Sequence, residues 1–234
     1  MKIALIGKGA MGQLVAAQVR NAGDEVGVTL SSSDATRSSD ELSAELRGHD
    51  VAVDFSAASG VLKSIEACAR ANVPLVEGTT GWQTQESEAR RLISEHDGAL
   101  VYGANFSLGV NLFYRIVAHA ASLFTSVENY ASFIEEAHHA RKRDAPSGTA
   151  LRLQTLMAKH LRSEIPIVST RAGHIPGTHR VGFDSAADQI VLTHEARSRE
   201  GFASGALLAA RWIVERKGIH EFSDVIEEIL KGER

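Results

Sequence analysis

The glycine-rich segment Gly7-Lys8-Gly9-Ala10-Met11-Gly12 constrains the fold of this chain more than any other part of its sequence. It follows the apolar run Ile3–Ile6, which is typical of a buried parallel strand, and precedes a stretch with apolar residues at helical spacing. In such a strand–turn–helix unit the glycines allow a tight turn, the approach of a pyrophosphate and close helix–strand packing. The helix N-terminus also attracts phosphate. We therefore predict that Gly7, Lys8, Gly9, Ala10, Met11 and Gly12 bind a dinucleotide.

The order of the expected strands and helices differs between the two halves of the chain. In the first hundred residues strands and helices alternate, with strands expected at 26–30, 51–55, 74–76 and 99–102 and helices at 38–46, 61–71 and 83–95. After about residue 108 the order is mixed, with strands expected at 130–135, 167–171, 179–183 and 189–194 and helices at 110–124, 149–161, 203–214 and 225–230. The fold class is therefore α/β: a Rossmann-like parallel-sheet dinucleotide domain followed by a second, α+β domain.

Composition narrows the class of function. The 234 residues carry 25 Lys and Arg against 29 Asp and Glu, a net charge of −4, which does not favour nucleic-acid binding. A single cysteine, Cys68, excludes an internal disulfide and is expected to be a small buried residue. No run of residues has the pattern of a signal sequence or reaches the ~18 apolar residues of a membrane span. A cytoplasmic protein that binds neither nucleic acid nor membrane is expected.

The residue that reads the adenosine ribose is left open by the sequence. An acidic residue ~20 positions after the glycines favours a ribose with a free 2′-hydroxyl. Asp34 follows the expected strand 26–30 and could take that role, while the serines at 31–33 together with Arg37 could hold a 2′-phosphate instead. An ordinary solvated loop is the third reading. We predict Asp34 as a cofactor-binding residue.

Two further loops follow expected strands at the edge where open α/β sheets bind ligands. The first holds Gly78, Thr79 and Thr80 after 74–76. The second follows 99–102, and its small residues and backbone N–H groups can flank a nicotinamide ribose. It consists of Gly103, Ala104, Asn105 and Phe106. We predict both loops to contact the cofactor, although either sequence alone is also compatible with a plain turn.

The segment 136–150 is the most informative for chemistry. It places five possible cations within six residues of a chain with net negative charge, which suits an anionic substrate: His138, His139, Arg141, Lys142 and Arg143. Pro-Ser-Gly-Thr then starts a helix, where Ser147 can cap and the N–H groups of Gly148 and Thr149 can bind a carboxylate. A histidine that titrates near neutral pH can transfer a proton there.

This segment resembles the signature E-x-H-H-x-x-K-x-D-A-P-S-G-T-A of the 4-hydroxy-tetrahydrodipicolinate reductase (dihydrodipicolinate reductase) family. Every specified position is met. The resemblance also runs in order through the rest of the chain, at 7–12, 53–56, 78–81, 104–111, 171–179, 194–199 and 202–206. It departs in the short stretch between the second and third strands, where the acidic residue common at the end of the second strand is absent.

The resemblance implies reduction of an unsaturated cyclic dicarboxylate by NADH or NADPH, on the route to diaminopimelate and lysine. In that reading His138 is the proton donor and acceptor, Lys142 is a second proton donor, and His139, Gly148 and Thr149 bind substrate carboxylates. It also implies a dinucleotide domain of 1–109 with 216–234, a substrate domain of 110–215, a hinge that closes over the substrate, and a homotetramer. The departure leaves the preference between NADH and NADPH open.

Other readings remain beside this one. A related reductase of a different imine or keto dicarboxylate would keep the same residues, so substrate profiling has to separate the two. A non-catalytic NAD(P)-sensing module is compatible with the first half of the chain, but it needs no proton donor. Neither the histidines at 174, 179 and 194 nor the 138–139 pair have a metal-ligand spacing, and we predict no metal.

Overall fold

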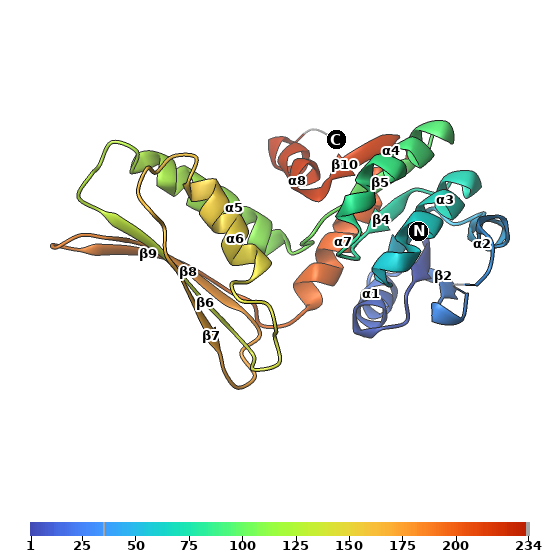
Figure 1. The fold of residues 1–234 in the computed structure, drawn as a ribbon. Helices are drawn as coiled ribbons and strands as arrows, with labels where there is room; N and C mark the ends of the chain where they lie inside the picture. Colours follow the sequence, from blue (N-terminus) through green and yellow to red (C-terminus); the bar gives the residue numbers. More distant parts are fainter. Residues whose placement is uncertain (35, 233–234) are drawn as a thin grey trace. The chain divides into compact units, whose positions relative to one another are not determined.

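The computed structural model describes residues 1–34 and 36–232, which form two compact units. Unit 1 comprises 1–108 and 199–234, and unit 2 comprises 109–198. Both units are coloured along the chain in Figure 1. We expected domain boundaries at 109/110 and 215/216, whereas the chain passes from one unit to the other at 108/109 and at 198/199.

Unit 1 is a parallel sheet with helices on both faces, which confirms the α/β class (Figure 1). Its strands stand in the order β10 (Gly218–Glu221), β5 (Ala99–Tyr102), β4 (Leu75–Glu77), β3 (Val51–Asp54), β1 (Lys2–Ile6) and β2 (Glu25–Leu30). Neighbouring strands all run parallel. Strand β10 was not predicted, because its short sequence Gly-Ile-His-Glu lacks an apolar run.

Alternate residues of the strands feed two hydrophobic cores in unit 1. Ile3 and Leu5 face one core and Ala4 and Ile6 face the other, because successive side chains of a strand point to opposite faces. The first core is covered by α1 (Ala10–Asn21), α7 (Glu200–Ile213) and α8 (Phe222–Lys231). The second is covered by α2 (Ser39–Leu46), α3 (Val61–Ala71) and α4 (Glu86–Glu95). Short 3-10 turns lie at η1 (Ser32–Asp34), η2 (Ala58–Gly60) and η3 (Gln83–Gln85).

Helix α7 explains the shifted domain boundary. Its face of small residues is fully buried against the sheet of unit 1, at Ala203, Ala206, Ala209 and Ala210. At Gly205 the helix comes so close to the backbone that an added Cβ would lie 1.7 Å from the carbonyl oxygen of Phe106. The helix therefore belongs to unit 1, although we expected it in the substrate domain.

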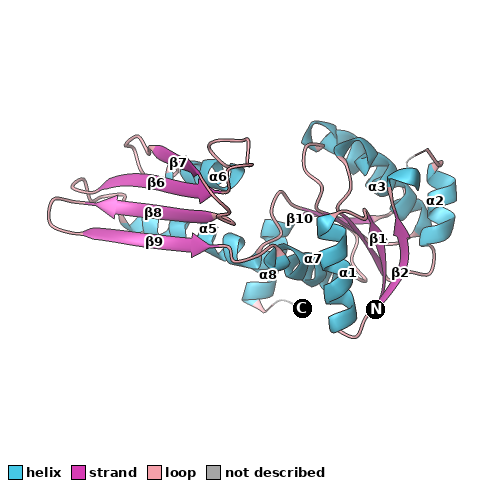
Figure 2. Ribbon diagram, turned by 90° about the horizontal axis from the view of Figure 1, so that it is seen from below, coloured by secondary structure: helices cyan, strands magenta, loops and turns pink. Residues whose placement is uncertain are grey.

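Unit 2 has a mixed sheet with both of its helices on one face, which confirms the α+β reading (Figure 2). The strands stand in the order β7 (Ile167–Arg171), β6 (Ala131–His138), β8 (Thr178–Asp184) and β9 (Gln189–Glu195). Strands β6 and β7 are parallel and the other pairs antiparallel. Helices α5 (Leu108–Leu123) and α6 (Gly148–Met157) bury residues such as Phe113 and Leu153 against Ile134 and Phe183 of the sheet.

Four side chains of unit 1 outside the predicted site have structural roles. Cys68 is buried in the second core of unit 1, as predicted, and Trp82 and Trp212 pack in the second and first cores. His49 serves the edge strand β2, because its Nε2 accepts a hydrogen bond of 3.0 Å from the backbone N–H of Val28. Within residues 1–34 and 36–232, no helix has the length and apolar character needed to cross a membrane.

Candidate active site

The three glycines of the first turn have different surroundings. Gly7 has φ +106°, and a Cβ there would lie 2.3 Å from the carbonyl oxygen of Phe55. A Cβ at Gly12 would lie 2.0 Å from the carbonyl oxygen of Gly7, so this glycine permits α1 to pack closely. A Cβ at Gly9 would meet no atom within 4 Å, which leaves the backbone there open to a ligand.

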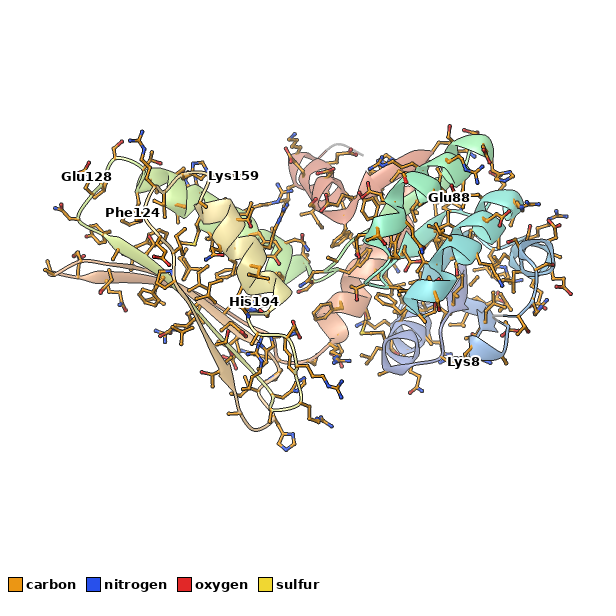
Figure 3. The ribbon with its side chains drawn as sticks, viewed as in Figure 1. Lys8, Glu88, Phe124, Glu128, Lys159 and His194 are labelled. Carbon is orange, nitrogen blue, oxygen red and sulfur yellow. The ribbon has the colours of Figure 1, made fainter. Side chains whose placement is uncertain are left out.

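A cavity of about 630 Å³ opens beside this turn. The predicted residues Gly7, Lys8, Gly9 and Asp34 line it, and Figure 3 labels Lys8 at the turn before α1. Ala10, Met11 and Gly12 form the first turn of α1 and are not part of the lining. Sequence reasoning missed some of its polar lining, namely Ser56, Ser59, Lys63 and Ser64. The open backbone at Gly9 and the concave, partly cationic wall fit a dinucleotide.

Asp34 and Arg37, the alternative ribose readers, are bound to each other. The Asp34 carboxylate accepts hydrogen bonds from the Ser31 backbone N–H (2.8 Å) and from Arg37 (3.3 Å). Arg37 also pairs with Glu45 at 2.7 Å. The backbone hydrogen bond from Ser31 is the largest cause that lowers the pKa of Asp34, and the Arg37 guanidinium lowers this pKa further. The loop thus holds a fixed carboxylate at the cavity wall.

The other two predicted cofactor loops meet around Phe55. A Cβ at Gly78 would lie 2.1 Å from the Phe55 ring, and the Phe106 ring meets Phe55 edge-on at a centroid distance of 6.2 Å. Phe106 is buried in the core, so its side chain packs rather than faces a ligand. The Thr79 hydroxyl accepts a hydrogen bond of 3.0 Å from the Ser56 N–H. The two loops follow the carboxyl ends of β4 and β5. Phe106 holds its loop in place by packing against Phe55, and Thr79 holds the other by its hydrogen bond with Ser56.

A pair of buried carboxyl groups lies beneath these loops. Asp54 and Glu77 end the neighbouring strands β3 and β4 and stand opposite each other in register. Glu77 accepts a 2.7 Å hydrogen bond from the Thr79 N–H, and Asp54 accepts a 3.4 Å hydrogen bond from the Thr79 hydroxyl. Burial raises the pKa of Asp54, and burial together with the charge of Asp54 raises the pKa of Glu77 well above its usual value. The pair thus favours a protonated carboxyl group in the interior.

This pair predicts a pH-dependent contribution to stability. Because the folded protein raises both pKa values, the contribution is complete below the pKa values of the unfolded chain and is lost as pH rises through the raised ones. Glu77→Gln imitates the protonated acid and does not titrate. As pH rises from about 4.5, we expect the melting temperature of the variant to increase relative to that of the wild type. Differential scanning calorimetry across pH checks this, with exposed Glu128→Gln as the control that keeps the wild-type slope.

In unit 2 the signature segment connects the end of β6 with the start of α6. His138 is the last residue of β6 and His139 follows it. Lys142, in the loop, forms an ion pair of 2.8 Å with Asp144. The Ser147 hydroxyl caps α6 by accepting from the Ala150 N–H at 3.2 Å. Gly148 and Thr149 are the first residues of the helix, whose N–H groups have no partner within the helix and can bind an anion.

A buried ion-pair network surrounds His138. Its Nδ1 is hydrogen-bonded to Oε2 of Glu136, and the Arg171 guanidinium binds both carboxylate oxygens of Glu136, at 2.9 and 2.7 Å. Burial alone would raise the pKa of Glu136, but hydrogen bonds, foremost from Arg171, hold it at about 2. Burial lowers the pKa of His138, and Glu136 opposes that shift. The sequence pointed to Glu136 and Arg171 through the family motifs but assigned them no role.

Two further histidines lie on the same face of the sheet. His179 Nε2 is 3.0 Å from the Ser147 hydroxyl, and its ring meets that of His138 edge-on at 5.1 Å. Burial lowers the pKa of His179 to about 4, so its ring is neutral at pH 7. His194, labelled in Figure 3, lies 5.8 Å from the Phe113 ring, and burial lowers its pKa as well. His179 thus supports the N-cap of α6.

One set of side chains in the described part of the chain has spacing that a metal ion could use. Glu136, His138 and His179 bring ligand atoms within 4.8 Å of one another. Both oxygens of Glu136 are already bound by Arg171, so a metal would have to displace a guanidinium from a buried carboxylate. The donor set therefore suits an ion pair better than a metal, and the absence of a metal stays a prediction.

Comparison with known proteins identifies the family. The family model for the N-terminal part of dihydrodipicolinate reductase matches residues 1–106, and that for the C-terminal part matches 109–226. The chain belongs to the dihydrodipicolinate reductase family. It is 37% identical to a 4-hydroxy-tetrahydrodipicolinate reductase of Christiangramia forsetii, with 99% of this chain and 100% of the relative covered. A 4-hydroxy-tetrahydrodipicolinate reductase of Laribacter hongkongensis is 34% identical, with 92% and 87% covered.

Solved structures agree on the fold of this reductase. Dihydrodipicolinate reductase from Paenisporosarcina sp. TG-14, solved with dipicolinate bound, superposes with a TM-score of 0.80 at 22% identity. That alignment covers 96% of this chain and 99% of the other. A probable dehydrogenase from Thermotoga maritima, at 11% identity and a TM-score of 0.59, covers 99% and 94% and shares the fold. The chain is an NAD(P)-dependent oxidoreductase of this family, and the resemblance seen in its motifs is confirmed.

Proposed function

We propose that the chain reduces 4-hydroxy-tetrahydrodipicolinate to tetrahydrodipicolinate, a step of the diaminopimelate route to lysine, with His138 and Lys142 transferring protons. The overall change replaces a ring hydroxyl by hydrogen: one hydride and one proton enter, and water leaves. The observation that carries the proposal is the segment from His138 to Thr149, which joins a histidine, a lysine and a free helix N-terminus in one short connection. These are the groups that a dianionic substrate needing a proton requires.

The residues of unit 2 divide the work in this proposal. Loss of water takes the hydroxyl and a proton from the adjacent ring carbon, and hydride then adds to the carbon that carried the hydroxyl. Protonated His138, whose Nδ1 is bound to Glu136, returns a proton from Nε2 to the adjacent carbon. Lys142 is the second donor, and Asp144 keeps its ammonium in place. His139 and the N–H groups of Gly148 and Thr149 bind the substrate carboxylates. Positive groups so close to the dicarboxylate also stabilise negative charge that develops during the reaction.

Unit 1 binds the cofactor in this account. The glycine turn and the cavity beside it receive the dinucleotide, and the loops at Gly78–Thr80 and 103–106 flank its nicotinamide end. The reduced nicotinamide supplies the hydride when bound. Asp34 offers a carboxylate to ribose hydroxyls, whereas Lys8 and Lys63 on the same cavity offer charge to a phosphate. NADH and NADPH are therefore both compatible with the cavity.

The remaining expectations concern assembly and location. We infer a homotetramer, and the open face of the sheet in unit 2 supports an interface: Val168 is 58% exposed there, on the side opposite α5 and α6. Phe133 lies on the same face of the sheet, where its ring covers Gly182. The cytoplasmic location and the closing hinge stay predictions.

A coupled assay tests the proposed function. The substrate is generated in place from pyruvate and aspartate semialdehyde by the preceding synthase, and loss of reduced-nicotinamide absorbance is followed with NADH and NADPH in parallel. Oxidation that depends on the synthase product supports the proposal, and the ratio of rates gives the cofactor preference. No oxidation by a folded protein that binds either cofactor contradicts it and favours a sensing module or a different substrate.

A further inference from the structure

Glu136 lies beneath the proton-transferring histidine as a fully buried carboxylate. Strand β6 points Ile134, Glu136 and His138 to the helix-covered face of the sheet, and the Glu136 side chain is 0% exposed. A buried carboxylate is costly unless it is paired and hydrogen-bonded. Arg171 on the neighbouring strand β7 supplies the pairing through two parallel hydrogen bonds, and the Ser147 N–H adds a third at 3.3 Å. Glu136 is thus held ionised at a fixed place.

The contact between Glu136 and His138 determines which ring nitrogen carries the proton. An ionised carboxylate can only accept hydrogen bonds, so the Nδ1 atom that contacts Oε2 of Glu136 must be the donor. The neutral ring is therefore the Nδ1–H tautomer, and Nε2 is the nitrogen that gains and releases a proton. A histidine is commonly oriented in this way by a hydrogen bond to its other nitrogen.

The free nitrogen faces a position without a side chain. A Cβ added at Gly177 would lie 3.2 Å from Nε2 and 3.3 Å from Cδ2 of His138, and Gly177 has φ +149°, which few other residues adopt. A side chain at 177 would therefore crowd the Nε2 edge of the ring, on the side away from Glu136, and glycine keeps that space clear. Proton transfer through Nε2 needs such an opening.

We propose that Glu136 is a positioning residue that fixes His138 as the Nδ1–H tautomer, stabilises its imidazolium and aims Nε2 at the substrate, with Arg171 keeping Glu136 ionised. This inference rests on the proposed function for its catalytic consequence, but not for the tautomer. The groups that face His138 otherwise oppose its positive form: burial, Lys142 and Arg171 lower its pKa, and the ring of His179 adds a neutral neighbour. Glu136 raises the pKa of His138 and so opposes all of these effects.

The pH profile of turnover tests the catalytic part. Glu136→Gln removes the negative charge and keeps the shape, so the pKa of His138 falls and its protonated form becomes scarce at neutral pH. We expect kcat at pH 7.5 to fall about 10²-fold, with the decline of kcat toward high pH moved about one unit lower or more. The KM for the cofactor should change little. A purely structural role would lower kcat at every pH without moving the decline, and that result overturns the proposal.

A matched control lies on the same strand. Glu135 is the neighbouring acid on the opposite face, where it pairs with Arg180 at 2.7 Å. Glu135→Gln removes the same charge from β6 and should keep the wild-type profile. Glu136→Asp retains the charge on a shorter side chain and should restore part of the lost turnover at neutral pH. If aspartate rescues no better than glutamine, the charge of Glu136 is not what His138 requires.

The tautomer can be read without any reaction. Nitrogen-15 NMR of histidine-labelled enzyme distinguishes a protonated Nδ1 from a protonated Nε2, with His138 assigned by its absence in His138→Gln. The proposal expects the Nδ1–H form in the wild type above the pKa, and the Nε2–H form there would overturn it, even where Glu136→Gln fails to fold. If the Nδ1–H form is found but the coupled assay shows no turnover, the proposed function fails and the tautomer assignment stands.

Discussion

Replacing His138 by glutamine is expected to lower kcat by about 10²- to 10⁴-fold, the usual contribution of a positioned proton donor. Glutamine can still form a hydrogen bond with Glu136, but it cannot give up a proton to the substrate. The dissociation constant for NADH should change little, because the predicted cofactor residues all lie in unit 1. Stopped-flow or steady-state oxidation of NADH measures kcat, and fluorescence titration of the bound cofactor measures the dissociation constant.

The control for this variant is His174→Gln, which changes an exposed histidine of the same unit. It should keep wild-type turnover. Full turnover by His138→Gln would remove His138 from proton transfer, and Lys142 would then be the remaining donor in the segment. Equal losses of turnover and of cofactor affinity would point to damage that reaches beyond the histidine.

Replacing Gly205 by alanine is expected to destabilise the protein by about 3 kcal/mol or more. An added Cβ would lie 1.7 Å from the Phe106 carbonyl oxygen and 3.3 Å from the Phe222 ring, and the first of these is backbone that cannot turn aside. Helix α7 would have to move away from the sheet, which separates Ala206 and Ala209 from the core they fill. Chemical denaturation followed by circular dichroism measures the loss.

Gly201→Ala provides the matched control on the same helix. A Cβ there would lie 3.6 Å from the Ser107 hydroxyl, which is an ordinary contact. Because alanine is the better helix former by roughly 0.5–1 kcal/mol, this variant should be as stable as the wild type or slightly more so. If Gly205→Ala were equally stable, the close approach of α7 to Phe106 would be wrong, and with it the assignment of α7 to unit 1.

The local patterns of the sequence predicted most of the fold. Helix 61–71 and strands 99–102 and 167–171 have the bounds expected from their apolar spacing. The helix expected at 38–46 is also present, and a capping box joins Ser38 and Glu41 at its start. Strand β10 escaped prediction because a parallel strand can form from four residues when its neighbour supplies the hydrogen bonds, here β5. The second domain boundary was misplaced because α7 has the same apolar spacing whichever sheet it covers.

The site was predictable as a set of residue types but not as a network. The signature predicted a helix start capped by Ser147, and α6 begins there, while the roles of His138 and Lys142 stay predictions. The partners of His138 come from other strands, since Arg171 and Gly177 are brought to it by β7 and the turn before β8. Asp54 and Glu77 likewise look like ordinary turn acids until β3 and β4 pair and bury them together. Such contacts depend on tertiary structure, which spacing in one sequence does not reveal.

The central claim is that the chain delivers a hydride and a proton to a cyclic dicarboxylate, and isotope labelling tests it most directly. The coupled reaction is run with NADH or NADPH carrying deuterium at the transferable position, and the product is examined by mass spectrometry and NMR. The account predicts one deuterium in each tetrahydrodipicolinate formed, on the ring carbon that lost its hydroxyl. Product without deuterium, or oxidised cofactor without reduced product, would contradict it.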